Sequence, residues 1–270
     1  MMNHSDGRHP AAPRIGLAVA HPGHELRLTR WIASQRPVVF ILTSGSRSGV
    51  DRARVDASRQ LLETLGARPG GMFGACLDRD IYGWIMAGEA FRFTALAQAL
   101  ADQIVAERLD AVVTDAWQLY NVAHDIWHLI TRVAVALASV RLGRRVDCFD
   151  YPVSPPSLAL RTTGETYDIL RLTDAEVERK LEMADAFPAI AGDVAEVLEA
   201  GGRAFLATES LHRLRPMSEL LPHPGETPIY ERFGEMRVQA GLYDLVLRWN
   251  HAAPIAAELV AMMAEREVAA

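Results

Sequence analysis

Two histidines lie directly after a short apolar run near the start of the chain. Residues 15–20 (IGLAVA) lie between Pro13 and Pro22, which predicts a buried parallel strand rather than a helix of the same length. His21 and His24 follow, three residues apart, and neutral imidazole is the commonest metal ligand in proteins. Open α/β sheets carry their chemistry at the carboxyl ends of strands, so this position favours a functional site. Two neighbouring histidines are more often exposed or hydrogen-bonded than metal-bound, so a metal site needs a third ligand.

A second polar cluster follows another strand-like run about a hundred residues later. Residues 111–114 (AVVT) predict a strand, and apolar residues at helical spacing from Ile126 onward predict a helix that His124 would open. Parallel strands end at the same side of a sheet, so we expect His124 to meet His21 and His24 in one crevice. Three nitrogen ligands with an open fourth position are typical of a catalytic zinc site.

His128 lies one turn further along the same predicted helix. Its apolar surroundings favour a packed histidine over a ligand. The sequence leaves open whether His128 replaces His124 as the metal ligand.

Both histidine segments resemble signatures of one family. Residues 20–25 (AHPGHE) resemble the Ala-His-Pro-Asp-Asp-Glu motif of the LmbE/PIG-L family of zinc-dependent N-acetylglucosaminyl deacetylases, and residues 121–124 (NVAH) resemble its His-Pro-Asp-His motif. Similarity extends over roughly residues 13 to 210, through segments that correspond to the family's glycine turn, arginine-bearing helix, Leu-x-x-Asp loop and late helix. The resemblance implies an α/β, Rossmann-like fold, with a mostly parallel sheet, helices on both faces and a C-terminal extension.

The resemblance also implies roles for particular residues. His21, His24 and His124 correspond to ligands of Zn²⁺ or another divalent transition metal. Arg54 and Asp80 correspond to substrate-binding positions.

The departures from the family pattern concern proton transfer. Gly23 stands where the family has its general base, and loss of a positioned base costs about 10²- to 10⁴-fold in rate. Glu25 and Asp125 are the carboxylates nearest in sequence to the expected ligands. Asn121 stands in place of a histidine; its amide can donate a hydrogen bond to an oxyanion but cannot shuttle a proton. Tyr120 is a candidate acid, although packing against the sheet is the favoured interpretation of that side chain.

Two functions from different classes are consistent with these residues. The first is a metal-dependent hydrolase that removes an N-acyl group from an amino-sugar or related small metabolite. The alternative is a degenerate family member that binds a sugar-like ligand without hydrolysing it, or that performs another metal-assisted reaction in a biosynthetic pathway. A third interpretation treats every histidine as scaffold and predicts no metal.

Length and composition predict one domain and a small-molecule partner. The chain has 270 residues, half of them hydrophobic, which suits a single domain over residues 13–270 after a disordered segment 1–12. Residues 201–270 are expected to form a lid or an oligomer contact, and we expect Pro254 to introduce a terminal helix. A net charge of −6 with scattered basic residues argues against nucleic-acid binding, and homo-oligomerisation stays open.

Cysteine content and hydropathy predict a cytoplasmic location. Cys76 and Cys148 are far apart in sequence, and no charged-then-apolar leader precedes Ile15. No apolar stretch approaches the roughly 20 residues that cross a bilayer, so no membrane association is expected.

Overall fold

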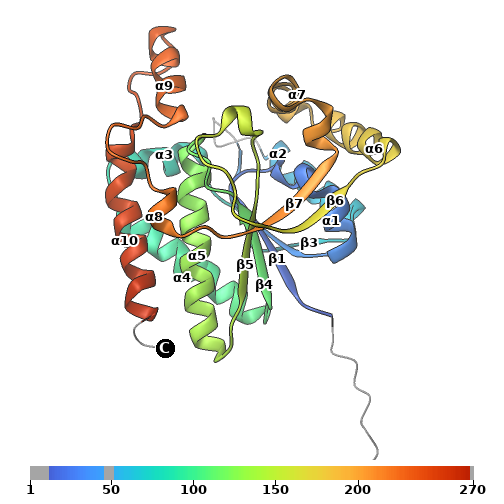
Figure 1. Cartoon of the computed structure of the whole chain (residues 1–270), viewed down its shortest axis with the longest axis horizontal. Helices are drawn as coiled ribbons and strands as arrows, with labels where there is room; N and C mark the ends of the chain where they lie inside the picture. The colour runs from blue at the N-terminus through green and yellow to red at the C-terminus, as the bar shows by residue number, and fades with distance from the viewer. Residues whose placement is uncertain (1–11, 46–51, 268–270) are drawn as a thin grey trace, which may run out of the picture.

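The computed structural model describes residues 12–45 and 52–267, with side chains described up to residue 263. The described residues form one seven-stranded sheet in the order β3-β2-β1-β4-β5-β7-β6 (Figure 1). The strands are β1 (Ile15–Val19), β2 (Val38–Thr43), β3 (Arg68–Cys76), β4 (Ala111–Asp115), β5 (Asp147–Tyr151), β6 (Thr166–Arg171) and β7 (Thr208–Arg213). Strands β1 to β5 are parallel, and β7 is antiparallel to both of its neighbours. The predicted mostly parallel sheet is confirmed.

Helices cover both faces of this sheet, as predicted. One face carries α4, α5 and α10, and the other carries α1, α2, α6 and α7 (Figure 1). The α-helices are α1 (Thr29–Gln35), α2 (Ala53–Thr64), α3 (Asp78–Met86), α4 (Ala90–Ala106), α5 (Val122–Leu142), α6 (Asp174–Asp185), α7 (Ala191–Leu206), α8 (Met217–Leu220), α9 (Ile229–Gln239) and α10 (Trp249–Glu267). Three short 3₁₀ helices accompany them in the described chain: η1 (His24–Leu28), η2 (Pro156–Leu158) and η3 (Pro188–Ile190).

Alternate residues of the central strands supply two separate hydrophobic cores. In β1, Ala18 belongs to the core beneath α4 and α5, whereas Leu17 belongs to the core beneath α1 and α2. Phe40 and Ile41 of β2 divide in the same way. This two-residue alternation is the geometry of an extended strand, and burial on both faces explains why these strands are apolar throughout.

The neighbouring positions of β1 and β4 bring the two histidine segments together. The two strands pair in parallel, with Ala18 opposite Thr114, so their carboxyl ends lie side by side. Helix α5 follows β4 after the loop of residues 116–121, and at its start the Asn121 side chain accepts a hydrogen bond from the Ala123 amide at 2.9 Å. Asn121 thus caps the helix that carries His124 in its first turn.

The start of the last helix differs from the sequence prediction. Helix α10 begins at Trp249, and Pro254 lies inside it rather than at its first turn. A proline at this depth removes one backbone hydrogen bond. Burial of Ala252, Ile255 and Leu259 against the core beneath α4 and α5 offsets that cost.

The remaining sequence predictions have mixed outcomes. Cys76 and Cys148 are free thiols, as expected. Within the described residues, no helix is both long enough and apolar enough to cross a membrane. The disorder predicted for residues 1–12 falls outside the described chain except at residue 12. The single domain over 13–270 stays a prediction.

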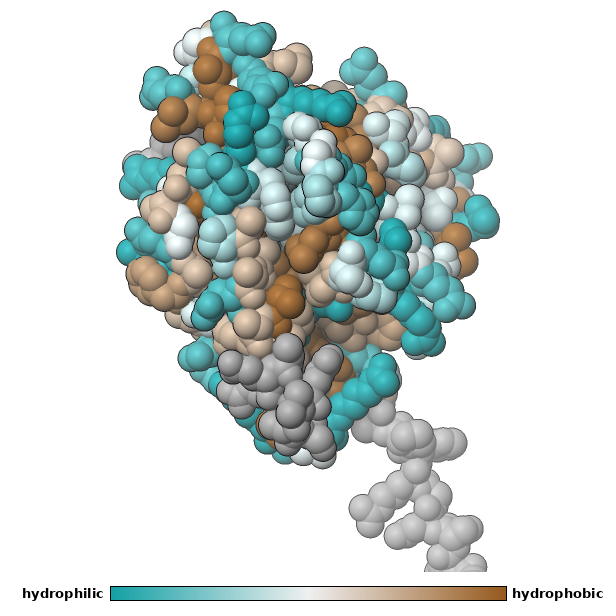
Figure 2. Space-filling model, turned by 60° about the vertical axis from the view of Figure 1, so that its left-hand side comes forward, coloured by the Kyte–Doolittle hydropathy of each residue, from teal (hydrophilic) through white to brown (hydrophobic). Residues whose placement is uncertain are grey.

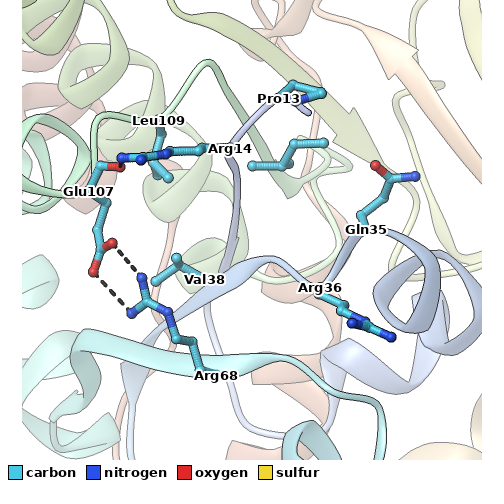
Figure 3. Close-up of a pocket in the computed structure, with 9 residues that line it drawn as sticks. Pro13, Arg14, Gln35, Arg36, Val38, Arg68, Glu107 and Leu109 are labelled. Carbon is cyan, nitrogen blue, oxygen red and sulfur yellow. Dashed lines mark hydrogen bonds and ion pairs between the residues drawn. The ribbon is translucent and has the colours of Figure 1, made fainter. Parts of the chain in front are cut away.

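A cavity of about 430 Å³ lies at the amino ends of β1 and β2, the opposite end of the sheet from the histidines (Figure 3). Its lining includes Arg14, Arg36 and Arg68, and Arg68 donates two hydrogen bonds to the Glu107 carboxylate, at 3.0 and 2.5 Å. No histidine or cysteine belongs to the lining. This cavity is therefore separate from the candidate chemistry.

Candidate metal centre

Three imidazole rings converge at the carboxyl ends of β1 and β4. The ring centroids are 5.4 Å apart for His21 and His24, 5.1 Å for His21 and His124, and 4.4 Å for His24 and His124. Three imidazoles bound to one tetrahedral zinc ion, with metal–nitrogen bonds of about 2.0–2.1 Å, have centroids roughly 5 Å apart. The ring positions therefore fit one shared ion.

The ring orientations are less favourable than the ring positions. In the described part of the chain, no three His, Cys, Asp or Glu side chains have their donor atoms grouped to hold a metal ion. Rotation about the Cβ–Cγ bond moves the nitrogen atoms of an imidazole but leaves its centroid almost in place. Metal binding would therefore require at least one ring to turn about this bond, with little movement of its centroid.

A carboxylate and a hydroxyl group hold His21. The His21 Nδ1 atom lies 2.7 Å from Thr43 Oγ1 and 3.0 Å from Asp78 Oδ1. The Thr43 hydroxyl donates to the same Asp78 oxygen at 3.0 Å. Because an ionised carboxylate only accepts, we assign the proton to His21 Nδ1, which leaves the Nε2 lone pair available.

A second carboxylate holds His24. The His24 Nδ1 atom lies 2.9 Å from Asp115 Oδ2, and Asp115 is fully buried. The same reasoning assigns the proton to Nδ1 and leaves Nε2 of His24 available.

The electrostatic surroundings keep His124 neutral. Burial, and then the proximity of His24 and His21, hold the pKa of His124 well below its usual value. Neutral imidazole is the form that binds a metal, so burial favours the ligand state. Burial opposes ionisation of Asp78, but hydrogen bonds from His21 and Thr43 lower its pKa overall.

Both carboxylates expected to relay a proton already accept hydrogen bonds from other groups of the protein. Glu25 is fully buried and accepts hydrogen bonds from the Ser58 hydroxyl and, at 2.9 Å, from the Gly23 amide. Burial raises the pKa of Glu25. Asp125 Oδ1 accepts from the backbone amides of residues 118 and 119 at 3.0 and 3.2 Å, and burial raises its pKa to about 8. These contacts give both residues a structural role.

Asn121 and Tyr120 lie at the start of α5. The Asn121 side-chain oxygen is engaged as the helix cap, and the Tyr82 hydroxyl lies 3.4 Å from it. The Tyr120 hydroxyl donates to Glu196 of α7 at 2.7 Å, and burial together with that carboxylate raises its pKa above the usual value. Tyr120 is half-buried and reaches α7 instead of packing against the sheet.

The two predicted substrate-binding residues differ in their surroundings. Arg54 donates to the Pro22 carbonyl at 3.2 Å and to Asp193 of α7 at 2.9 Å, which places it against the turn between the two histidines. Its Nε atom is buried without a hydrogen-bond partner among the described residues. Asp80 is half-buried at the start of α3, and Arg79 Nε lies 3.6 Å from its carboxylate.

His128 is a packed histidine in this structure. Its ring is fully buried, its Nδ1 atom donates to the Asp115 carbonyl at 2.9 Å, and burial lowers its pKa to about 3. It packs edge-on against Trp117, with ring centroids 6.3 Å apart. The histidine that joins His21 and His24 is His124.

Gly23 has a backbone conformation that other residues avoid. Its φ is +105°, and a Cβ atom at this position would lie 3.1 Å from the Ile190 side chain. The turn after β1 therefore requires glycine.

Sequence reasoning gave no role to the two carboxylates that contact the histidines. Asp115 ends β4 and Asp78 begins α3 two residues after β3. Both are acidic residues at the carboxyl end of a parallel strand, the same signal that identified His21 and His24.

Comparison with known proteins shows similarity in fold alone. No family model matches the sequence, and no curated protein does. The conserved protein TT1542 from Thermus thermophilus aligns with a TM-score of 0.50 and 16% identity, over 79% of this chain and 99% of that one. The A40926 pseudoaglycone deacetylase Dbv21 aligns with a TM-score of 0.49 and 15% identity, over 78% of this chain and 100% of the other. A zinc-inhibited form of the teicoplanin deacetylase Orf2 aligns with a TM-score of 0.45 and 12% identity, over 73% of this chain and 97% of the other. The chain has an LmbE-like α/β fold, as its two histidine motifs predict.

Proposed function

We propose that this chain is a metal-dependent hydrolase that removes an N-acyl group from an amino-sugar or related small metabolite. His21, His24 and His124 would hold Zn²⁺ or another divalent transition metal. The observation that carries the proposal is the convergence of these three rings within 5.4 Å of one another. When bound, such an ion supplies Lewis acidity and a nucleophilic water near neutral pH.

The chain's own residues would bind and polarise the acyl group. The oxygen of Asn121 is engaged by the backbone of α5, so its amide N–H groups are the part that can donate to a developing oxyanion. Arg54 has a buried Nε–H without a partner in the described residues, which suits a substrate hydroxyl or carboxylate. Asp80 is proposed as a second substrate contact.

Among the proposed proton-relay residues, Glu25 has the strongest support. Glu25 follows His24 directly in the chain, and burial raises the pKa of its carboxylate above the usual value. Asp125 is bound to the backbone of residues 118 and 119 instead. Tyr120 as an acid would first have to break its hydrogen bond to Glu196.

One observation favours the alternative of ligand binding without hydrolysis. Gly23 cannot supply a base, and Ile190 lies where a side chain at residue 23 would begin. A site of this kind retains the histidines and the Arg54 contact but lacks the positioned carboxylate that speeds water attack.

We also propose that part of the segment 201–270 covers the site. Tyr120 contacts α7 through Glu196 and α9 through Phe233, whose ring centroid lies 5.8 Å away, so two helices flank this loop. Met236, Leu242 and Leu245 on α9 and the loop beyond it are 63–70% exposed. Figure 2 shows hydrophobic atoms gathered near the top of the view, the height at which α9 lies in Figure 1. Exposed apolar side chains of this kind suit a lid or a contact between subunits.

Metal content and activity test the proposal together. We expect close to one zinc ion for each wild-type chain and release of acetate from N-acetylglucosaminyl conjugates. His124→Ala should lose both, whereas His223→Ala, which removes a histidine outside the three-ring cluster, should lose neither. Metal binding without acetate release would favour the binding alternative, and equal metal content in wild type and His124→Ala would refute the site.

A further inference from the structure

The buried carboxylate of Asp115 has three hydrogen-bond donors. Its Oδ2 atom accepts from His24 Nδ1 at 2.9 Å and from the Ala20 amide at 2.8 Å. Its Oδ1 atom accepts from the Tyr151 hydroxyl at 2.8 Å. These donors come from β5 and from the segment just beyond β1, so Asp115 is fixed in position and does not follow the His24 ring.

We propose that Asp115 is a positioning residue that sets the tautomer of His24 and keeps its Nε2 lone pair free for a metal ion. An ionised carboxylate has no proton to donate, so the His24 nitrogen beside it must carry one. In metal sites, a carboxylate on the second ring nitrogen fixes the ring and raises its basicity, and its loss costs 10- to 100-fold in metal affinity or activity. The metal-affinity part of this inference rests on the proposed function, whereas the tautomer part does not.

The charge of Asp115 complements that of a bound cation. The three imidazoles bring no negative charge to the centre. Asp115 is fully buried one hydrogen bond behind His24, where water screens its charge weakly. A divalent cation at the rings would be stabilised by this anion through His24.

Two variants separate the charge of Asp115 from its role as an acceptor. In Asp115→Asn, the side-chain oxygen must still face the Ala20 amide, which can only donate, and this same oxygen serves His24. The Nδ1-protonated tautomer should therefore persist while the charge is lost. Asp115→Ala removes the acceptor as well, so the proton of His24 should shift toward Nε2. Tyr151→Phe is the matched control, because it removes a hydrogen bond from the other oxygen of the same carboxylate.

The first readout is the tautomer of His24 in metal-free protein, from ¹⁵N chemical shifts of the imidazole. We expect Nδ1 protonation in wild type, Asp115→Asn and Tyr151→Phe, and a shift to Nε2 protonation in Asp115→Ala. Nδ1 protonation that survives in a folded Asp115→Ala protein would overturn the inference, as would Nε2 protonation in the wild type. This readout holds even if the wild type binds no zinc, an outcome that would refute the proposed function alone.

The second readout is zinc affinity, measured by competition with a chelator. Asp115→Asn should weaken binding about 10- to 100-fold, and Tyr151→Phe less than about threefold. Equal affinities in these two variants would overturn the charge effect. Since Asp115→Asn keeps the size of the native side chain and the oxygen that accepts from Ala20 and His24, the comparison remains decisive if Asp115→Ala fails to fold.

Discussion

Substitution of Lys180 by Met should destabilise the protein strongly. The Lys180 ammonium lies 2.7 Å from Glu209, and the two side chains are 2% and 1% exposed. Lys180 also donates to the backbone carbonyls of Arg27 and Leu206, each at 3.1 Å. The pair therefore joins α6 and β7 to η1, the short helix that begins at His24.

The size of the loss depends on what remains around Glu209. Removal of one partner of a buried ion pair costs about 3–5 kcal/mol, because the other charge stays buried without compensation. Glu209 would keep three donors: the amides of Trp31 and Arg30, at 2.8 and 3.1 Å, and the Thr29 hydroxyl at 3.3 Å. These donors lie in the first turn of α1, so its positive end still faces the carboxylate. We therefore expect the lower end, about 3 kcal/mol, which corresponds to a Tm lower by roughly 6–12 °C.

Urea unfolding followed by circular dichroism at pH 7 measures this loss. The matched control is Arg203→Met, which breaks the surface ion pair between Arg203 and Glu178, whose side chains are 45% and 60% exposed. That control should cost less than about 1 kcal/mol. A free energy of unfolding for Lys180→Met within about 1 kcal/mol of the wild-type value would refute the reasoning.

Three further predictions concern other parts of the molecule. Arg161 donates two hydrogen bonds to Glu226, and these bonds lower the pKa of Glu226 to about 2. The contribution of Glu226 is complete above its unfolded pKa of about 4.5 and lost as pH falls toward 2. In urea unfolding, Glu226→Gln should therefore lower the free energy of unfolding by about 1 kcal/mol at pH 7 and by close to nothing near pH 2. A difference between variant and wild type that does not change with pH would contradict this. Gly23→Ala should lower the free energy of unfolding by about 1–3 kcal/mol, because the φ of Gly23 is +105°. The control Gly192→Ala, in an open position of α7, should leave stability unchanged or raise it slightly. Equal melting temperatures of the two variants would refute the strain at Gly23. If zinc binds at a concentration a hundred times its Kd, it should stabilise the wild type by about 2.7 kcal/mol. Removing zinc with a chelator should therefore lower the Tm of the wild type and leave the Tm of His124→Ala unchanged.

The sequence predicts the parts of this fold that depend on local pattern. The apolar residues 15–20 and 111–114 indicated buried strands, and both are parallel strands at the middle of the sheet. The rule that parallel strands end on one side then brought His124 to His21 and His24 across a hundred residues of sequence. The capping box at Thr173 and Glu176 is likewise a local feature, because it depends on residues three apart.

Features that depend on tertiary contacts could not be predicted in the same way. Lys180 and Glu209 pair across 29 residues that include η3 and α7, and Asp115 and His24 pair across 91. No spacing rule links such residues, because their contact depends on strand order and on how helices pack. Pro254 was misplaced for a related reason: its local signal marks a helix start, but burial of α10 outweighs the lost hydrogen bond.

Gly23 shows how the structure changes the meaning of a sequence difference. From sequence, glycine at the family's base position indicates a lost carboxylate that Gly23→Asp would restore. The φ of +105° and the nearness of Ile190 mean that any side chain there would strain the turn between His21 and His24. Failure of Gly23→Asp to gain activity would therefore not separate a decayed enzyme from one with different chemistry. Metal content and ligand binding of the native chain separate them better, because they leave this turn intact.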